Sequence, residues 1–194
     1  MSGVRAQDII LAGVGGQGIL SIAFIIDSAA LKEGFHIKQA EVHGMAQRGG
    51  AVQSHLRLSR DPIWSDLIPR GRADLILSVE PLEALRYLDF LAPGGRIVTS
   101  STPFVNIPDY PDIATVLARI RQVPGSVIVD SEALAKEAGT SRAQNTVMLG
   151  AAARFLIVSP ESLIEYINVL FAPRGEKILA PNLKAFELGR RASE

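Results

Sequence analysis

The chain of 194 residues contains no cysteine. This absence excludes disulfides, thiolate nucleophiles and cysteine-ligated iron–sulfur clusters from the chain itself, so such chemistry has to come from another polypeptide. The charge balance also lacks a dominant sign, because 20 basic and 20 acidic residues cancel. A neutral chain argues against general binding of nucleic acids and against binding to a membrane surface.

Long uninterrupted apolar runs are missing as well. The longest one near the N-terminus, residues 19–31, is broken by Ser21, Asp27 and Ser28, and the residues before it lack the apolar core of a signal peptide. We therefore expect a cytoplasmic protein. With 47% hydrophobic residues, the chain is long enough to bury one substantial core, and we expect a single domain over residues 1–194.

Several catalytic signatures are absent. The sequence has no G-x-S-x-G elbow, and its glycine-rich turn lacks the Lys-[Ser/Thr] of a Walker-type phosphate loop. The three histidines, His36, His43 and His55, show neither i, i+4 pairing nor an H-E-x-x-H context, so no metal site is predicted. We interpret them as structural or surface residues, with His43 a candidate for function because it lies in a glycine-rich loop.

The main positive feature is the glycine turn that follows a short apolar run at the N-terminus. Gly13, Gly15 and Gly18 match G-x-G-x-x-G, and residues 8–20 predict a strand, a turn and the start of a helix. Such a turn can present backbone N–H groups to a phosphate. It can equally serve only the turn and the packing of helix on strand, and the pattern leaves both alternatives open.

The order of the remaining patterns predicts the fold class. Residues 19–31 predict a helix buried nearly all round, residues 35–42 a strand, and residues 51–59 an alternating strand with one polar face. The short connection between the two strands favours a hairpin, while residues 73–100 form a strand–helix–strand unit of a parallel sheet. Helices are predicted over residues 143–158, from Pro160 to about residue 171, and from near Pro181 onward. We expect an α/β, Rossmann-like three-layer fold with a mostly parallel sheet, one hairpin-like strand pairing and a helical C-terminal part.

A dinucleotide-binding fold also needs an acidic residue at the end of its second strand, about 20 positions past the glycines. Glu41 is the nearest candidate, 23 residues after Gly18, but a glycine-rich loop follows it instead of a crossover helix. That loop, residues 41–50, gathers a carboxylate, an imidazole, an amide and a guanidinium. It is either a second candidate site or a plain connection turned by Gly49 and Gly50.

The two glycine-rich motifs together resemble a known family. Gly13-Val14-Gly15-Gly16-Gln17-Gly18, followed by His43-Gly44-Met45-Ala46-Gln47-Arg48-Gly49-Gly50, is similar to the gamma subunits and gamma domains of the 2-oxoacid:ferredoxin oxidoreductases. Within that family, the resemblance is greatest to the small beta subunits that act on indolepyruvate. Segments 80–84, 145–150 and 182–189 share the resemblance, which therefore spans nearly the whole chain.

The resemblance implies a subunit that is inactive alone. The complex would oxidatively decarboxylate a 2-oxoacid with coenzyme A, giving acyl-CoA, carbon dioxide and reduced ferredoxin. Thiamine diphosphate, Mg²⁺ and the iron–sulfur clusters would belong to a large partner subunit in a hetero-oligomer, with no cofactor held covalently here. Ferredoxin would meet the complex, coenzyme A would be the co-substrate, and the isolated chain is compatible with a homodimer.

The resemblance also assigns candidate site residues. It implies that the two motifs help to close the thiamine site and receive coenzyme A, with His43 and Arg48 as the candidates for a catalytic role. Two further functions stay open at this point, namely a free-standing NAD(P)-binding Rossmann protein and a non-catalytic binding module. The implied cofactor-binding residues are Gly13, Gly15, Gly16, Gln17, Gly18, Gln47, Arg48, Gly49 and Gly50.

Overall fold

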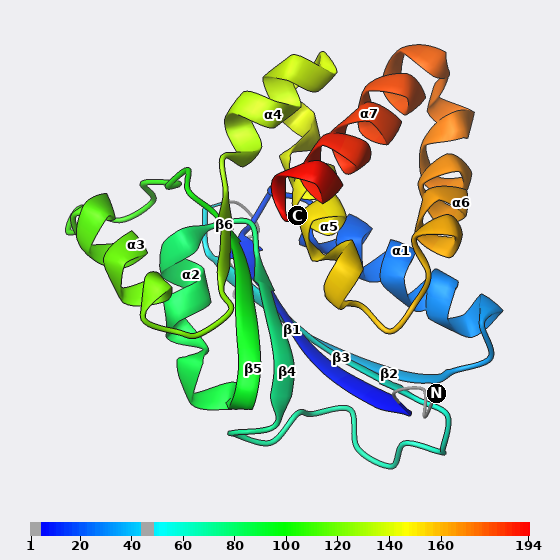
Figure 1. Ribbon diagram of the computed structural model, residues 1–194, viewed down its shortest axis with the longest axis horizontal. Helices are drawn as coiled ribbons and strands as arrows, with labels where there is room; N and C mark the ends of the chain where they lie inside the picture. Colours follow the sequence, from blue (N-terminus) through cyan, green and yellow to red (C-terminus); the bar gives the residue numbers. More distant parts are fainter. Residues whose placement is uncertain (1–4, 44–48) are drawn as a thin grey trace.

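A six-stranded mixed sheet lies between two layers of helices in the computed structural model, which describes residues 5–43 and 49–194 (Figure 1). The order of the strands across the sheet is β2-β3-β1-β4-β5-β6. Their bounds are β1 Ala6–Val14, β2 His36–His43, β3 Ala51–Ser59, β4 Ala73–Ser78, β5 Leu91–Ser100 and β6 Val127–Val129.

Strand β3 runs against both of its neighbours. The pairs β1·β4, β4·β5 and β5·β6 are parallel, whereas β3 is antiparallel to β1 and to β2. The predicted hairpin between β2 and β3 is therefore confirmed, and it brings β3 between β2 and β1. The three-layer α/β class is also confirmed, with two antiparallel pairings where the sequence predicted one.

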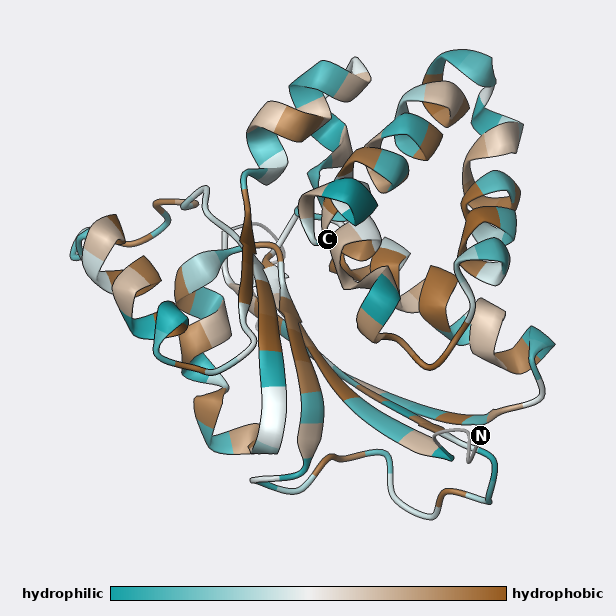
Figure 2. Cartoon of the chain, viewed as in Figure 1, coloured by the Kyte–Doolittle hydropathy of each residue, from teal (hydrophilic) through white to brown (hydrophobic). Residues whose placement is uncertain are grey.

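The helices cover the two faces of the sheet and enclose two separate cores. Successive residues of β1 alternate between them, because Ile9 and Leu11 face one core and Ile10 faces the other. The apolar strands at the centre of the sheet stand out in Figure 2. One layer holds α1 Ile19–Lys32, α4 Ser131–Ala138, α5 Gln144–Ala152, α6 Pro160–Phe171 and α7 Glu176–Ala192, and the other holds α2 Pro81–Arg86 and α3 Ile113–Arg121.

Two helix boundaries differ from the prediction. The helix expected over residues 143–158 ends at Ala152, because the side chain of Gln7 takes over the backbone groups that follow, bonding the carbonyl of Phe155 at 2.6 Å and the N–H of Ile157 at 2.9 Å. Helix α7 begins at Glu176 and runs through Pro181. A proline there removes only one hydrogen bond near the start of the helix, which the packed helix tolerates.

Helix α1 is less buried than its composition predicted. Leu20, Phe24 and Leu31 are 54%, 43% and 64% exposed, and their spacing places them along one outer face. The rest of the apolar residues of α1 pack against the sheet and α6. None of the helices in the described parts of the chain has the length and apolar character that a membrane crossing requires.

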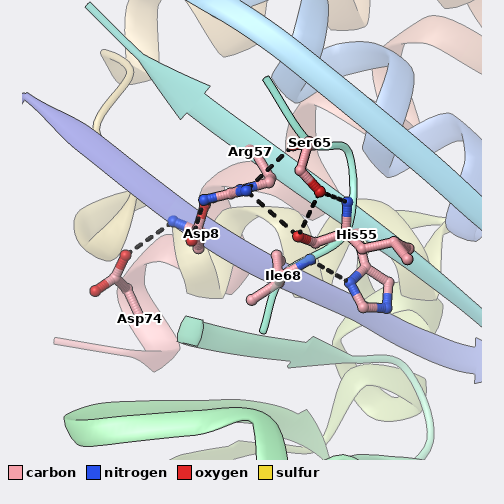
Figure 3. A network of polar contacts seen from close by, with 7 residues as sticks. Asp8, His55, Arg57, Ser65, Ile68 and Asp74 are labelled. Atoms are coloured by element: carbon pink, nitrogen blue, oxygen red, sulfur yellow. Dashed lines mark hydrogen bonds and ion pairs between the residues drawn. The ribbon is translucent and has the colours of Figure 1, made fainter. Parts of the chain in front are cut away.

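A polar network fixes the connection between β3 and β4 at the edge of the sheet opposite the glycine turn (Figure 3). Arg57 donates to both carboxylate oxygens of Asp8, at 2.9 and 3.2 Å, and to the carbonyl of Ser65 at 3.1 Å. His55 accepts from the N–H of Ile68 at 3.0 Å and is only 3% exposed. His55 is therefore a buried structural residue, which agrees with the prediction of structural or surface histidines. Burial lowers the pKa of His55. Trp64, which lies in the connection between β3 and β4, is 94% exposed.

The backbones of α5 and α7 touch where two glycines face each other. A Cβ at Gly150 would lie 2.1 Å from the carbonyl oxygen of Phe186, and one at Gly189 would lie 2.0 Å from that of Val147. Real Cβ atoms do not approach oxygen so closely, so any side chain here would force the helices apart.

We expect Gly189→Ala to lower the free energy of unfolding by about 1 to 3 kcal/mol, despite the higher helix propensity of alanine. Urea denaturation measures this change. Glu187→Ala on the same helix is the matched control, and it should stay within about 0.5 kcal/mol of the parent because it alters only a half-exposed ion pair. An equal effect of the two substitutions would contradict the close contact.

Asp27 is a polar residue within the packed layer of α1. Its Oδ1 is buried without a hydrogen-bond partner among the described residues. Burial, with a smaller effect of the Glu41 carboxylate, raises the pKa of Asp27 to about 7. The carboxyl group of Asp27 therefore stays protonated up to about pH 7 in the folded chain, whereas it loses its proton at about pH 4 in an unfolded chain.

Rising pH should consequently lower stability across that window, since the folded state binds the extra proton. We expect Asp27→Asn to remove this dependence. Its gain in unfolding free energy over the parent should be larger at about pH 8 than at about pH 5, by on the order of 2 kcal/mol. Denaturation at the two pH values measures it, and a gain that is independent of pH would show that Asp27 does not titrate in this range.

Candidate functional site

The glycine turn lies at the carboxyl end of β1 and leads directly into α1. Gln17 closes it, because its side-chain Oε1 accepts the N–H of Val14 at 2.8 Å and its own N–H donates to the carbonyl of Val14 at 3.0 Å. Gly18 is the N-cap of α1 with φ of 79°, and it packs against Asn145, whose amide donates to its carbonyl at 3.3 Å. A Cβ at Gly18 would lie 2.5 Å from that amide nitrogen, so the turn requires glycine there.

The structure brings the two glycine motifs into direct contact. The N–H of Gly15 donates to the carbonyl of Gly50 at 2.8 Å, and the N–H of Gly49 donates to the carbonyl of Gly15 at 3.3 Å. A third segment joins them, because the side-chain amide of Asn106 donates to the carbonyl of Gly49 at 2.8 Å. Three loops far apart in the sequence therefore meet at one edge of the sheet.

Part of the second motif lies outside the described residues. This holds for Gln47 and Arg48 and for the side chain of His43. Their assignment to the site remains a prediction from the sequence.

Two cavities flank the glycine turn. One, of about 420 Å³, is mostly apolar and includes Leu20 and Val52 in its lining. The other, of about 540 Å³, lies between the turn, the residues that follow β4 and β5, and the start of α5. We call this second cavity the crevice. It lies where the chain switches from helices on one face of the sheet to helices on the other, which is where open α/β sheets bind ligands.

The crevice carries polar groups suited to an anionic ligand. Thr102, Ser141, Gln144 and Asn145 contribute hydroxyl and amide groups, and Arg142 contributes a guanidinium. The ion pairs among the described residues include none to Arg142, and Glu132, which also lines the crevice, pairs with Lys136. No sequence motif includes Arg142, which reaches this edge only because the turn between α4 and α5 lies there.

The acidic residue required by a dinucleotide-binding fold is displaced. Glu41 lies on β2, which β3 separates from β1, and its carboxylate accepts from the side chain of Gln39 at 2.7 Å. In a nucleotide-binding fold that acid lies on the strand next to β1. This geometry argues against a ribose contact by Glu41. Among the described residues, no three or more histidine, aspartate or glutamate side chains form a group that could hold a metal ion.

Comparisons with known proteins agree with this architecture. The chain is 35% identical to the indolepyruvate oxidoreductase subunit IorB of Thermococcus kodakarensis, over 98% of each chain. It is 32% identical to the ketoisovalerate oxidoreductase subunit VorA of Methanothermobacter thermautotrophicus, over 92% of this chain and 35% of that one.

Two solved structures share the fold. The first is a 2-oxoglutarate:ferredoxin oxidoreductase from Magnetococcus marinus with 2-oxoglutarate, coenzyme A and succinyl-CoA bound, at a TM-score of 0.79 and 24% identity over 98% of this chain and 31% of that chain. The second is the gamma subunit of a keto/oxoacid ferredoxin oxidoreductase from Geobacter sulfurreducens, at a TM-score of 0.69 and 23% identity over 96% and 98%.

The family resemblance that the paired glycine motifs indicated is thereby confirmed over nearly the whole sequence. The profile of one family, described as pyruvate ferredoxin/flavodoxin oxidoreductase, matches residues 8–192. The chain belongs to the pyruvate ferredoxin/flavodoxin oxidoreductase family.

Proposed function

We propose that this chain is the small subunit of a thiamine-diphosphate-dependent 2-oxoacid:ferredoxin oxidoreductase. The complex converts a 2-oxoacid and coenzyme A to acyl-CoA and carbon dioxide, and the two electrons released reduce ferredoxin. Four relatives at 35% identity are indolepyruvate oxidoreductase subunits, which supports an arylpyruvate as the substrate. The other 2-oxoacids named among the relatives belong to chains of 28% to 32% identity.

The residues of the chain support a division of labour with a larger partner. No cysteine is present to ligate an iron–sulfur cluster, so the clusters, thiamine diphosphate and Mg²⁺ are assigned to the partner in a hetero-oligomer. This subunit is then inactive by itself and acts in the cytoplasm as one domain over residues 1–194. Its part is to shape the site and to bind coenzyme A.

One observation carries the proposed site, namely the backbone hydrogen bonds that join Gly15 to Gly49 and Gly50. They hold both family motifs against each other beside a crevice that contains an arginine. Coenzyme A has phosphates that an arginine can contact with two parallel hydrogen bonds. The 540 Å³ of the crevice also falls within the usual range for small-molecule and cofactor sites.

Exposed apolar side chains near this edge support contact with a partner. Leu20 at the start of α1, Val42 near the end of β2, and Phe104 and Val105 after β5 are between 43% and 69% exposed. Phe104 lines the crevice and Leu20 lines the apolar cavity on the other side of the turn, and exposed apolar side chains next to a cavity are typical of a surface that another chain covers. The partner would then close the site and exclude water from it.

Arg142 provides a direct test. We expect Arg142→Ala, in the complex reconstituted with its large subunit, to raise the Michaelis constant for coenzyme A about tenfold, since one hydrogen-bonded charge contact is lost. The Michaelis constant for the 2-oxoacid should not change. Arg121→Ala at the end of α3, on the opposite face of the sheet, removes the same charge outside the crevice and should have no effect.

Steady-state kinetics with each substrate varied in turn measures these constants. The same assay applied to Arg48→Ala tests the second motif. If Arg48→Ala leaves both Michaelis constants and the turnover unchanged, the role assigned to that motif is wrong. If Arg142→Ala behaves like Arg121→Ala, the crevice does not bind coenzyme A.

A further inference from the structure

The loop between β5 and α3, residues 101–112, forms one wall of the crevice. Thr102, Pro103 and Phe104 line the cavity. Three prolines, at positions 103, 108 and 111, predict a loop on the surface. Hydrogen bonds nevertheless hold the loop in two ways. Asn106 donates to the carbonyl of Gly49, and Phe104 and Tyr110 donate to the buried carboxylate of Glu80.

Glu80 anchors this loop from inside the molecule. It is the N-cap of α2 and is only 1% exposed. Its Oε1 accepts from the N–H of Phe104 at 3.3 Å and from the hydroxyl of Tyr110, while its Oε2 accepts from the N–H of Glu83 at 2.8 Å. One carboxylate therefore holds two points of the loop and the start of a helix.

Burial of a carboxylate that has no ion-pair partner costs free energy unless donors form hydrogen bonds to its oxygens. The salt bridges among the described residues include none to Glu80, so its partners are these three donors. Burial and the hydrogen bond to the Glu80 carboxylate raise the pKa of Tyr110, as expected for a hydroxyl that donates to a buried carboxylate. Loss of one donor leaves part of the carboxylate unsatisfied, and the loop loses its fixed position.

Asn106 extends this anchor to the glycine motifs. Its amide donates to the carbonyl of Gly49 at 2.8 Å, and the N–H of Gly49 donates to the carbonyl of Gly15 at 3.3 Å. A continuous series of contacts thus runs from Glu80 through the loop to Gly49 and then to Gly15 of the glycine turn.

We propose that Glu80 is a positioning residue that sets the loop of residues 101–112 and, through Asn106, the position of Gly49 against the glycine turn. A change in the position of the loop should then also change the positions of Gly49 and of the glycine turn. The consequence for coenzyme A rests on the proposed function, whereas the coupling of the loops concerns this chain alone. The two can be tested separately.

Glu83 supplies a matched control. It is also 1% exposed and belongs to the same helix, but its carboxylate bonds Arg86 at 3.0 Å and makes no hydrogen bond to residues 101–112 in the described structure. Glu83→Gln therefore removes the ion pair with Arg86 and no hydrogen bond to the loop. It changes the same chemical group as Glu80→Gln without touching the loop.

The first experiment measures hydrogen exchange of backbone amides in the isolated chain. Tyr110→Phe deletes one donor to Glu80 and keeps the ring. We expect it to speed the exchange of the amides of Phe104, Gly15 and Gly49 about tenfold, the ratio for loss of one hydrogen bond to a charged acceptor. Glu80→Gln should act on the same amides, and Glu83→Gln should leave them unchanged. Unchanged exchange at Gly15 and Gly49 in Tyr110→Phe would overturn the proposal.

A double-mutant cycle then tests the path through Asn106. In the background of Asn106→Ala, Tyr110→Phe should still speed exchange at Phe104 but should no longer change Gly15 or Gly49. If the effect on Gly15 and Gly49 persists at full size without the Asn106 amide, the coupling does not run through this contact and the proposal fails.

The functional consequence is measured in the reconstituted complex. Tyr110→Phe should raise the Michaelis constant for coenzyme A several-fold with little change in turnover, and Glu83→Gln should match the parent. Faster exchange at the glycines together with an unchanged Michaelis constant would support the positioning role and contradict the binding of coenzyme A in the crevice. A changed constant without faster exchange would contradict the positioning role.

Discussion

The antiparallel ladder between β1 and β3 is the constraint on which the site depends. Gly13 pairs with Val52 and Val14 pairs with Ala51, so the ladder leads directly into the hydrogen bond between Gly15 and Gly50. A slip of one residue would turn every side chain of β3 to the opposite face. Because Leu56 and Leu58 must stay in the core, the apolar pattern of β3 fixes the register. That register in turn decides which atoms of the two glycine motifs meet.

Two buried carboxylates, those of Glu80 and Glu83, lie in the packing that supports this edge. Glu80 and Glu83 are buried at the start of α2; both oxygens of Glu80 accept hydrogen bonds, whereas Glu83 accepts from Arg86 through Oε1 and its Oε2 has no partner among the described residues. A buried acid contributes little net stability compared with an apolar residue of the same size. It does impose direction, because its oxygens accept only from donors in fixed positions. The polar residues near the crevice therefore define geometry, while the two apolar cores supply most of the stability.

The sequence predicted most of the strands and singled out the two glycine motifs whose ends meet in the structure, but it did not predict the other residues that line the crevice. The strand over residues 51–59 and the helix that begins at Pro160 follow from local periodicity and from the preference of proline for the first turn of a helix, which act within a few residues. Arg142 and Asn106 could not be found in this way, because only the tertiary fold brings them to the glycine turn. The end of α5 could not be predicted for the same reason. The backbone groups of Phe155 and Ile157 bond the side chain of Gln7, which lies more than 140 residues earlier in the chain.

The comparisons add a constraint on how the site is completed. The same fold accounts for 98% of the Geobacter sulfurreducens gamma subunit but for 31% of the Magnetococcus marinus chain and 35% of VorA, where the matched region is one part of a longer polypeptide. A covalent link keeps neighbouring domains at high effective concentration, so their interface needs little affinity of its own. A subunit that is a separate polypeptide, such as the Geobacter sulfurreducens gamma subunit, has to obtain that affinity from its surface. Exposed apolar side chains such as Leu20, Phe104 and Val105 are of the kind that supply such affinity, so the proposed partner contact and the proposed ligand site share one edge of the sheet.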